Sequence, residues 1–291
     1  MHVKRVLVAG ATGYLGRYVI KELKRQGFYI KVLVRHPGKL NQTGNFLEPS
    51  IGEDVDEVAI GDITKPDTLK HICDNIDYVF SSVGITRKSN GLTFKDVDYQ
   101  GNVNLLKEVE NSHVAKFMYI HVCINDDWKE PGPLIEAKKR FVEVLTASNV
   151  DHIIIRPTGY FSDLTQFLTM AKKGRVYLIG DGKTRMNPIH GQDLAQFCIQ
   201  SFSEVNQILD VGGPEILTYE QIAKLAFDVL DRKEHITHIP VGLLNSVSLG
   251  LRLFSKHNYG VLRFFMNVMT HNVTAPMYGK HKIKSVFYET I

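Results

Sequence analysis

The chain of 291 residues has few side chains arranged to cross-link or to hold a metal. Its three cysteines lie far apart with no Cys-x-x-Cys spacing, which excludes a disulfide framework and indicates free, buried thiols in a reducing compartment. Its twelve histidines are scattered and form no His-Glu-x-x-His pattern, so we expect no metal site. The Gly-x-Ser-x-Gly marker of serine hydrolases is also missing.

Long apolar runs are missing as well. The longest, residues 239–254, is interrupted by polar residues and is too short to span a bilayer. The first residues enter a predicted strand at once and show no pattern of a secretory signal. We therefore expect a cytoplasmic protein with one large core, or with a core and a smaller attached lobe.

Acidic residues are absent from one long stretch near the C-terminus. None occurs between Glu234 and Glu289, and eight Lys or Arg residues from Arg232 onward oppose only these two acids, which gives a net charge of +6. The stretch is also rich in Leu, Phe, Val and Met. It indicates either a basic amphipathic surface for weak contact with a membrane or a protein, or a helical lobe with a packed apolar face and a solvated basic face. Because its Phe and Leu fall where a core needs them, we expect no nucleic-acid binding.

Short apolar runs that alternate with helical patterns predict an α/β fold. The runs are rich in Val, Ile and Leu, which is typical of strands covered on both faces. Such alternation predicts a doubly wound parallel sheet of the Rossmann kind, with right-handed crossovers. The predicted strands are residues 5–9, 29–34, 58–60, 78–82, 117–122, 152–155 and 208–211.

The alternation stops beyond Pro214, where helical patterns follow one another. The first predicted helix, residues 219–230, begins with the capping-box residues Thr218 and Gln221, and the second covers residues 243–254. The predicted domains are therefore a dinucleotide-binding type of domain at residues 1–214, which contributes to a substrate lobe from about residue 157, and a mainly helical C-terminal lobe at residues 215–291.

A glycine-rich turn follows the first predicted strand. Gly10, Gly13 and Gly16 are three residues apart, and a helical run over residues 17–25 follows them. Glycines let the backbone approach a pyrophosphate, and the N–H groups and dipole of a helix attract the anion. The strand, turn and helix together predict a dinucleotide site, and the alternative is a tight turn without a ligand.

A cation at the end of the second predicted strand indicates which dinucleotide is bound. NAD sites usually have an acid there, which bonds the ribose 2′-hydroxyl. This chain has Arg35, with Lys39 nearby, and no acid before Glu48. Because a guanidinium is the natural partner of a 2′-phosphate, we predict NADP, bound as NADPH, rather than NAD. The alternative is that Arg35 only caps the strand at the surface.

These and further motifs along most of the chain resemble the short-chain dehydrogenase/reductase superfamily, in its atypical NmrA-like branch of NAD(P)-binding Rossmann proteins. The sequence is also similar to the nucleotide-binding accessory subunit of respiratory complex I. The resemblance implies contacts with the cofactor from the glycine turn, from the ends of later strands and from one helix. The residues that it implies are Gly10, Thr12, Gly13, Tyr14, Leu15, Gly16, Arg35, Asp62, Ile63, Ser82, Val83, Gly84, Lys138, Pro157 and Thr158.

The resemblance breaks at the catalytic tyrosine. Reductases of this superfamily commonly have a Tyr four residues before a Lys, whose charge lowers the pKa of the Tyr that transfers a proton. Here Lys138 fits the lysine position, whereas Leu134 stands at the tyrosine position. The resemblance implies that Lys138 binds the nicotinamide ribose and that Tyr160, His121, Tyr99 or water supplies the proton.

Lys138 and Tyr160 are our candidate catalytic residues. Their alternatives are a surface lysine and an aromatic ring that only shapes the pocket, and His121 fits a core histidine. The motifs predict an NADPH-dependent reductase of a small organic molecule, which they do not identify further. The alternative is a non-catalytic NADPH-binding protein that senses redox state or helps to assemble a complex.

Overall fold

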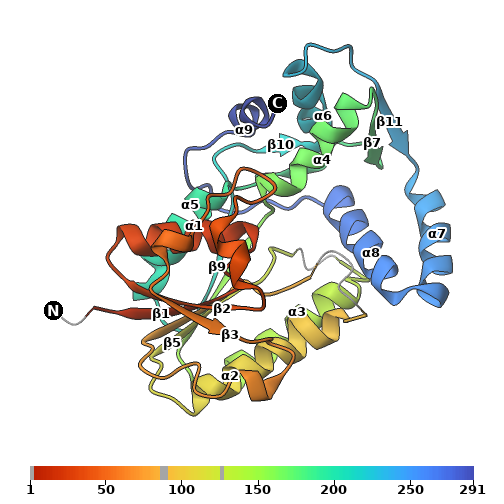
Figure 1. Cartoon of the computed structure of the whole chain (residues 1–291). Coiled ribbons are helices and arrows are strands. Elements are labelled where there is room, and N and C mark those ends of the chain that lie inside the picture. Colours follow the sequence, from red (N-terminus) through yellow and green to blue (C-terminus); the bar gives the residue numbers. More distant parts are fainter. Residues whose placement is uncertain (1–2, 86–90, 125–127) are drawn as a thin grey trace. The chain divides into compact units, whose positions relative to one another are not determined.

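The computed structural model describes residues 3–85, 91–124 and 128–291. Its main element is a seven-stranded sheet in the order β3-β2-β1-β4-β5-β6-β9 (Figure 1). The pairings from β3 through β6 are parallel. Because the strand order reverses between β1 and β4, as in doubly wound sheets, the predicted Rossmann fold class is confirmed. The strands are β1 (Arg5–Ala9), β2 (Tyr29–Val34), β3 (Glu57–Ile60), β4 (Tyr78–Ser81), β5 (Lys116–Ile120), β6 (His152–Pro157) and β9 (Gln207–Val211).

Helices cover both faces of this sheet. Helix α1 (Tyr14–Arg25) lies on one face, and α2 (Asn102–Glu110) and α3 (Pro133–Ala147) lie on the other (Figure 1). A π-helix, η4 (Lys95–Gly101), leads directly into α2. The remaining helices are α4 (Phe161–Lys172), α5 (Gly191–Gln200), α6 (Tyr219–Asp228), α7 (Val241–Phe254), α8 (Lys256–Thr270), α9 (Ile283–Glu289) and the short turns η1 (Pro37–Asn41), η2 (Gly52–Asp54), η3 (Pro66–Thr68) and η5 (Ser201–Ser203).

The chain forms two compact units that are not contiguous in sequence. Unit 1 takes in the described residues of Met1–His121, Glu136–Ile155 and Leu194–Leu209. Unit 2 takes in those of Val122–Ile135, Arg156–Asp193 and Asp210–Ile291. The domain division at residue 214, drawn along the sequence, stays a prediction.

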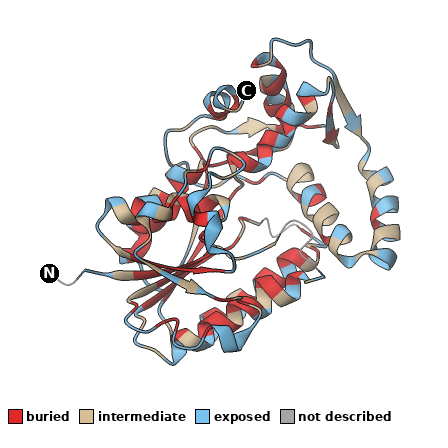
Figure 2. Ribbon diagram, viewed as in Figure 1, coloured by how far each residue is buried: buried red, intermediate tan, exposed pale blue. Residues whose placement is uncertain are grey.

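The core of unit 1 lies against the inner strands of the sheet (Figure 2). Side chains of Leu7, Val79 and Phe117 are fully buried there. Tyr119 of β5 belongs to the same core, and its ring meets that of Phe141 edge to face with centroids 4.6 Å apart. The hydroxyl of Tyr119 is therefore buried in an apolar core, where it needs a polar partner.

Unit 2 has its own core beneath α4, α6 and α9. Two small sheets join it: β7 (Val176–Ile179) pairs with β11 (Ile236–Ile239), and β8 (Arg185–Met186) pairs with β10 (Leu217–Thr218). The capping box of α6 is confirmed, because the Thr218 hydroxyl accepts from Gln221 N and the Gln221 side chain accepts from Thr218 N. The strands β10 and β11 lie beyond Pro214, where the sequence pattern predicts only helices, since such short and partly polar strands leave no clear alternation.

The structure also describes the state of the cysteines and the length of the apolar helices. Cys73, Cys123 and Cys198 are free and buried, as predicted. In the part of the chain that the structure describes, no helix has both the length and the apolar character needed to cross a membrane.

A histidine pair in unit 2 makes stability depend on pH. The rings of His190 and His281 lie 4.4 Å apart, and Nδ1 of His281 bonds Oδ1 of Asp193 at 2.7 Å. Burial, with the charge of His281, lowers the pKa of His190 to about 4. An unfolded histidine binds its proton at about pH 6.5, so between these values the unfolded state binds more protons and the free energy of unfolding falls as the pH falls.

We expect His190→Gln to lose less stability than the wild-type protein between pH 6.5 and 4.5. The measurement is urea unfolding at a series of pH values. His36→Gln is the control for the loss of an imidazole, because His36 is exposed and lies in unit 1. Identical slopes for His190→Gln and the wild-type protein would contradict the assignment.

Candidate functional site

A pocket in unit 1 lies at the carboxyl ends of β1, β2, β3 and β4. Ligands of doubly wound sheets bind at this edge, where the strand order reverses. Nine of the predicted cofactor residues line the pocket: Gly10, Thr12, Gly13, Arg35, Asp62, Ile63, Ser82, Val83 and Gly84. The structure therefore brings together four segments that are far apart in the sequence.

Two positions, one in the turn after β1 and one in the first turn of α1, have room for glycine only. Gly10 has φ +89°, and a Cβ there would lie 2.6 Å from Oγ of Ser82. A Cβ on Gly16 would lie 2.1 Å from the carbonyl oxygen of Gly10. Gly13 is the N-cap of α1, whose first turn carries no acidic side chain. The N-terminus of α1 has no acid that would repel an anion, and the glycines leave its backbone N–H groups accessible. Both features suit the binding of a phosphate group.

The other predicted residues of this turn have different positions. Leu15 and Gly16 are buried in the first turn of α1, where they pack the helix close to β1. The ring of Tyr14 meets that of Tyr18 edge to face at 5.4 Å. These three residues are absent from the lining of the pocket as far as the described residues show, so their contact with a cofactor stays a prediction.

Arg35 and Asp62 give the pocket one charge of each sign. Arg35 is exposed directly after β2, and Asp62 follows β3. Burial alone would raise the pKa of Asp62, but hydrogen bonds from Thr64 and the charges of Arg35 and Lys65 outweigh it and lower that pKa. Asp62 therefore carries its negative charge at neutral pH, and Arg35 lies close enough to stabilise it.

The buried Arg17 of α1 is a residue of this region that the sequence analysis missed. Its guanidinium donates to four backbone carbonyl groups, three of them in the segment that follows Arg35. The acceptors are the carbonyl oxygens of Thr12, Lys39, Gln42 and Pro49. Arg17 thus fixes the segment that carries Lys39 against the glycine turn.

Side chains of η4 and α2 form hydrogen bonds with the end of β4 and with the loop that follows it. Nδ2 of Asn102 donates to the carbonyl oxygen of Val83, and Oδ1 of Asn102 accepts from Ser81 Oγ at 2.6 Å. Oδ2 of Asp98 accepts from Ile85 N at 3.1 Å. Asp98 lies within the π-helix η4, a rare conformation that is frequent at functional sites.

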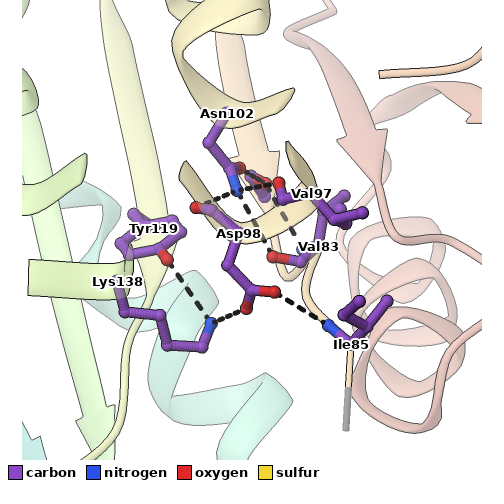
Figure 3. Close-up of polar contacts among 8 residues, drawn as sticks. Val83, Ile85, Val97, Asp98, Asn102, Tyr119 and Lys138 are labelled. Carbon is purple, nitrogen blue, oxygen red and sulfur yellow. Dashed lines mark hydrogen bonds and ion pairs between the residues drawn. The ribbon is translucent and has the colours of Figure 1, made fainter. Parts of the chain in front are cut away.

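A buried polar cluster lies beside this loop (Figure 3). Nζ of Lys138, on α3, lies 3.2 Å from Oδ1 of Asp98 and 3.4 Å from the hydroxyl of Tyr119. Only 9% of Lys138 is exposed, which excludes a surface lysine. Asp98 and Tyr119 are both fully buried. The sequence pattern hides them, because Tyr119 lies in an apolar strand and Asp98 in a polar helix start.

The cluster keeps the charge on Lys138. Burial alone would lower the pKa of Lys138, but the charge of Asp98 and the hydrogen bonds with Tyr119 and Asp98 raise it above the ordinary value. Burial raises the pKa of Tyr119, so its phenol is neutral at physiological pH. The cluster therefore holds an ammonium group where few water molecules can reach it.

Gly84 connects this cluster with the pocket. Gly84 is exposed and lines the pocket, and a Cβ there would lie 2.5 Å from Oδ1 of Asp98 and 3.1 Å from Nζ of Lys138. Because Gly84 has no side chain, the ammonium lies directly beneath the pocket edge. Lys138 is absent from the lining of the pocket as far as the described residues show, so its contact with a cofactor or substrate stays a prediction.

The remaining candidates have mainly structural contacts. Leu134 is buried, so no polar side chain takes the tyrosine position. His121 is buried beside Tyr119, with ring centroids 6.3 Å apart, as a core histidine would be. Tyr99 packs against the core of unit 1.

Three candidates belong to unit 2 and are described within it. Tyr160 is the N-cap of α4 and forms a bridge with Ile189. Pro157 and Thr158 are buried, and Oγ1 of Thr158 donates to the carbonyl oxygen of Asn187 at 2.5 Å. Their contact with a cofactor or substrate stays a prediction.

Comparison with known proteins defines the class to which this fold and pocket belong. Residues 10–204 match a family model described as NAD(P)H-binding. The chain belongs to this NAD(P)H-binding family, which confirms the nucleotide-binding resemblance found in the sequence. The predicted resemblance to an accessory subunit of respiratory complex I is also confirmed. The mitochondrial subunit 9 of the NADH dehydrogenase (ubiquinone) 1 alpha subcomplex of Arabidopsis thaliana is 23% identical to this chain. The match covers 83% of this chain and 61% of that subunit.

Two other curated relatives are more similar. A chloroplastic divinyl chlorophyllide a 8-vinyl-reductase of Cucumis sativus is 28% identical over 94% of this chain and 66% of its own length. The photosystem II assembly factor Ycf39 of Synechocystis is 26% identical over 86% of this chain and 75% of its own length. The chain spans 61% to 66% of the length of the first four curated relatives, which are all vinyl-reductases.

Solved structures show the same fold. The structure of AtPrR2 with NADP+ and (+)pinoresinol has a TM-score of 0.73, with 15% sequence identity and coverage of 100% of both chains. At this level of identity the likeness supports the Rossmann architecture only.

Proposed function

We propose that this protein is an NADPH-dependent reductase of a small organic molecule that has an activated C=O or C=C bond. The observation that carries the proposal is the buried ammonium of Lys138, held by Asp98 and Tyr119 beneath Gly84 at the edge of the pocket. Burying a charge is costly, and charged groups that are held in a buried position beside a pocket are frequent at functional sites, which supports the proposal. The names of the vinyl-reductase relatives support a double bond as the group that is reduced.

NADPH is the cofactor that the charges of the pocket favour. Arg35 supplies an exposed guanidinium at the end of β2, where a 2′-phosphate would bind. The uncharged first turn of α1 and the glycine turn suit the pyrophosphate. Asp62 would bond the adenine side of the cofactor. We also propose a cytoplasmic location, and the free, buried cysteines support a compartment that keeps thiols reduced.

The chemistry that we assign to the chain is proton transfer and charge stabilisation. When bound, NADPH would supply the hydride, and Tyr160 or water would supply the proton that completes the reduction. The ammonium of Lys138 would stabilise the negative charge that develops on the substrate and would bind the nicotinamide ribose. Tyr119 and Asp98 would position this ammonium and keep it charged. Tyr160, Pro157 and Thr158 are proposed to line the substrate side.

The test is oxidation of NADPH in the presence of a panel of quinones, enones and aldehydes. The loss of NADPH absorbance measures the rate of the reaction. We expect turnover with at least one electron-poor member of the panel and a larger rise in Tm with NADPH than with NADH, because a ligand of the folded state stabilises it. NADPH binding without oxidation on any member of the panel would contradict the reductase proposal.

A second function is favoured by one observation. Leu134 places a buried apolar side chain where related reductases have their tyrosine, which suits a protein that binds NADPH without using it. The likeness to an assembly factor supports this candidate, a scaffold or redox sensor that binds other proteins. Tight NADPH binding, no turnover and a partner whose recovery on pull-down depends on NADPH would establish it.

A further inference from the structure

Helix α7 of unit 2 presents an apolar face to solvent. Most of the helix is exposed or half-buried (Figure 2). Ser248 is the one buried residue among its fourteen. Leu253 is 78% exposed and Phe254 is 90% exposed, and Leu243 and Leu249 are each at least 60% exposed. Single exposed apolar residues are common on protein surfaces, but a continuous group of this size indicates a contact surface.

The exposed apolar side chains of α7 form a face that contains no charged side chain. At 3.6 residues per turn, Leu243, Val247 and Phe254 form one stripe, and Leu249 and Leu253 form the adjacent stripe. The positions between these stripes are small residues: Gly242, Ser246 and Gly250. The opposite side of α7 packs against α8. We call the face formed by Leu243, Val247, Leu249, Leu253 and Phe254 the α7 face.

Basic side chains border the α7 face, and acids are absent from the surrounding sequence. Arg252 is exposed on the polar side of α7, and Lys256 is exposed two residues after Phe254. Between Glu234 and Glu289 the sequence has six Lys or Arg residues and no Asp or Glu. A partner of this surface must therefore combine apolar groups with negative charge.

We propose that the α7 face binds to the surface of a bilayer that contains anionic lipids. The apolar stripes would enter the boundary between headgroups and acyl chains, while Arg252 and Lys256 would contact lipid phosphates. The fourteen residues of α7 make a helix about 21 Å long. That length suits a helix that lies in the plane of the interface, because a bilayer core is about 30 Å thick.

The test is sedimentation of the full chain with vesicles, at low salt, in two compositions. We expect binding to vesicles of phosphatidylcholine with 30% phosphatidylglycerol and much weaker binding to pure phosphatidylcholine. The double variant Leu253→Asp/Phe254→Asp should reduce binding to the anionic vesicles by about 100-fold, because each side chain loses its apolar transfer. Arg252→Glu/Lys256→Glu should reduce it by more than about tenfold, and 0.5 M salt should act in the same direction.

The matched control is Ile216→Asp/Ile291→Asp. These two residues are also exposed and apolar, 48% and 58%, and they lie outside α7, so this variant should bind like the wild-type protein. Urea unfolding with the midpoint and slope of the wild-type protein shows that each variant is folded. Equal binding to neutral vesicles, no binding to either composition, or a wild-type dimer that Leu253→Asp/Phe254→Asp converts to a monomer would each overturn the proposal.

Discussion

Replacing Lys138 with Met is expected to reduce kcat for NADPH oxidation by about 10²-fold to 10³-fold, the range for loss of one group that stabilises developing negative charge. The physical reason is the loss of the ammonium beneath Gly84, which no other described cation near this position replaces. NADPH should still bind, at most about tenfold more weakly, because the hydrogen bonds to the ribose are a small part of the total. Steady-state kinetics and calorimetric titration with NADPH measure the two effects separately.

The single substitution also changes stability, so a second variant is needed. Lys138→Met leaves the carboxylate of Asp98 buried and unpaired, which costs about 3–5 kcal/mol. The double variant Asp98→Asn/Lys138→Met removes both charges and should unfold at a higher urea concentration than the single variant. Lys139→Met, on the exposed side of the same helix, is the control for general effects on α3. A folded double variant with wild-type kcat would show that the ammonium has no part in catalysis.

Reversing the charge of Arg35 is expected to change the choice of cofactor. Arg35→Glu should weaken NADPH binding by about 10-fold to 100-fold, because a charge-assisted contact with the 2′-phosphate contributes about 1.5–3 kcal/mol. Binding of NADH should change little or improve, since a carboxylate can accept from the 2′-hydroxyl. Calorimetric titration with both nucleotides gives the ratio of their Kd values directly.

Lys65 provides the control for this experiment. It is an exposed cation next to Thr64 of the pocket, and its charge also lowers the pKa of Asp62. If Arg35 acts through a specific phosphate contact, Lys65→Ala should leave the ratio of Kd values close to that of the wild-type protein. A loss of NADPH preference in Lys65→Ala as large as that in Arg35→Glu would indicate a general electrostatic effect instead.

The pattern of strands and the glycine turn could be predicted from the sequence because both depend on local chemistry. Buried parallel strands need continuous apolar runs, and the close approach of Gly10, Gly16 and Ser82 tolerates no Cβ on either glycine. The predicted pocket residues that follow β2, β3 and β4 could also be placed together, because parallel strands end at one edge of a sheet.

The polar cluster around Lys138 could not be predicted, because it depends on contacts between distant segments. Asp98, Tyr119 and Lys138 come from η4, β5 and α3, and no spacing in the sequence relates them (Figure 3). Tyr119 has the pattern of a core residue, and only the need of a buried hydroxyl for a partner distinguishes it. Arg17 was missed because its acceptors are backbone carbonyl groups, which leave no trace in the sequence.

Because Arg17 binds backbone carbonyl groups, the conformation of residues 36–49 depends little on which side chains this segment carries. Every residue type carries a carbonyl oxygen, so exchanges of exposed side chains in this segment leave the acceptors of Arg17 in place. On the proposed role of Arg35 and Lys39, substitutions at these two positions would change the cofactor preference while the backbone acceptors of Arg17 stay in place.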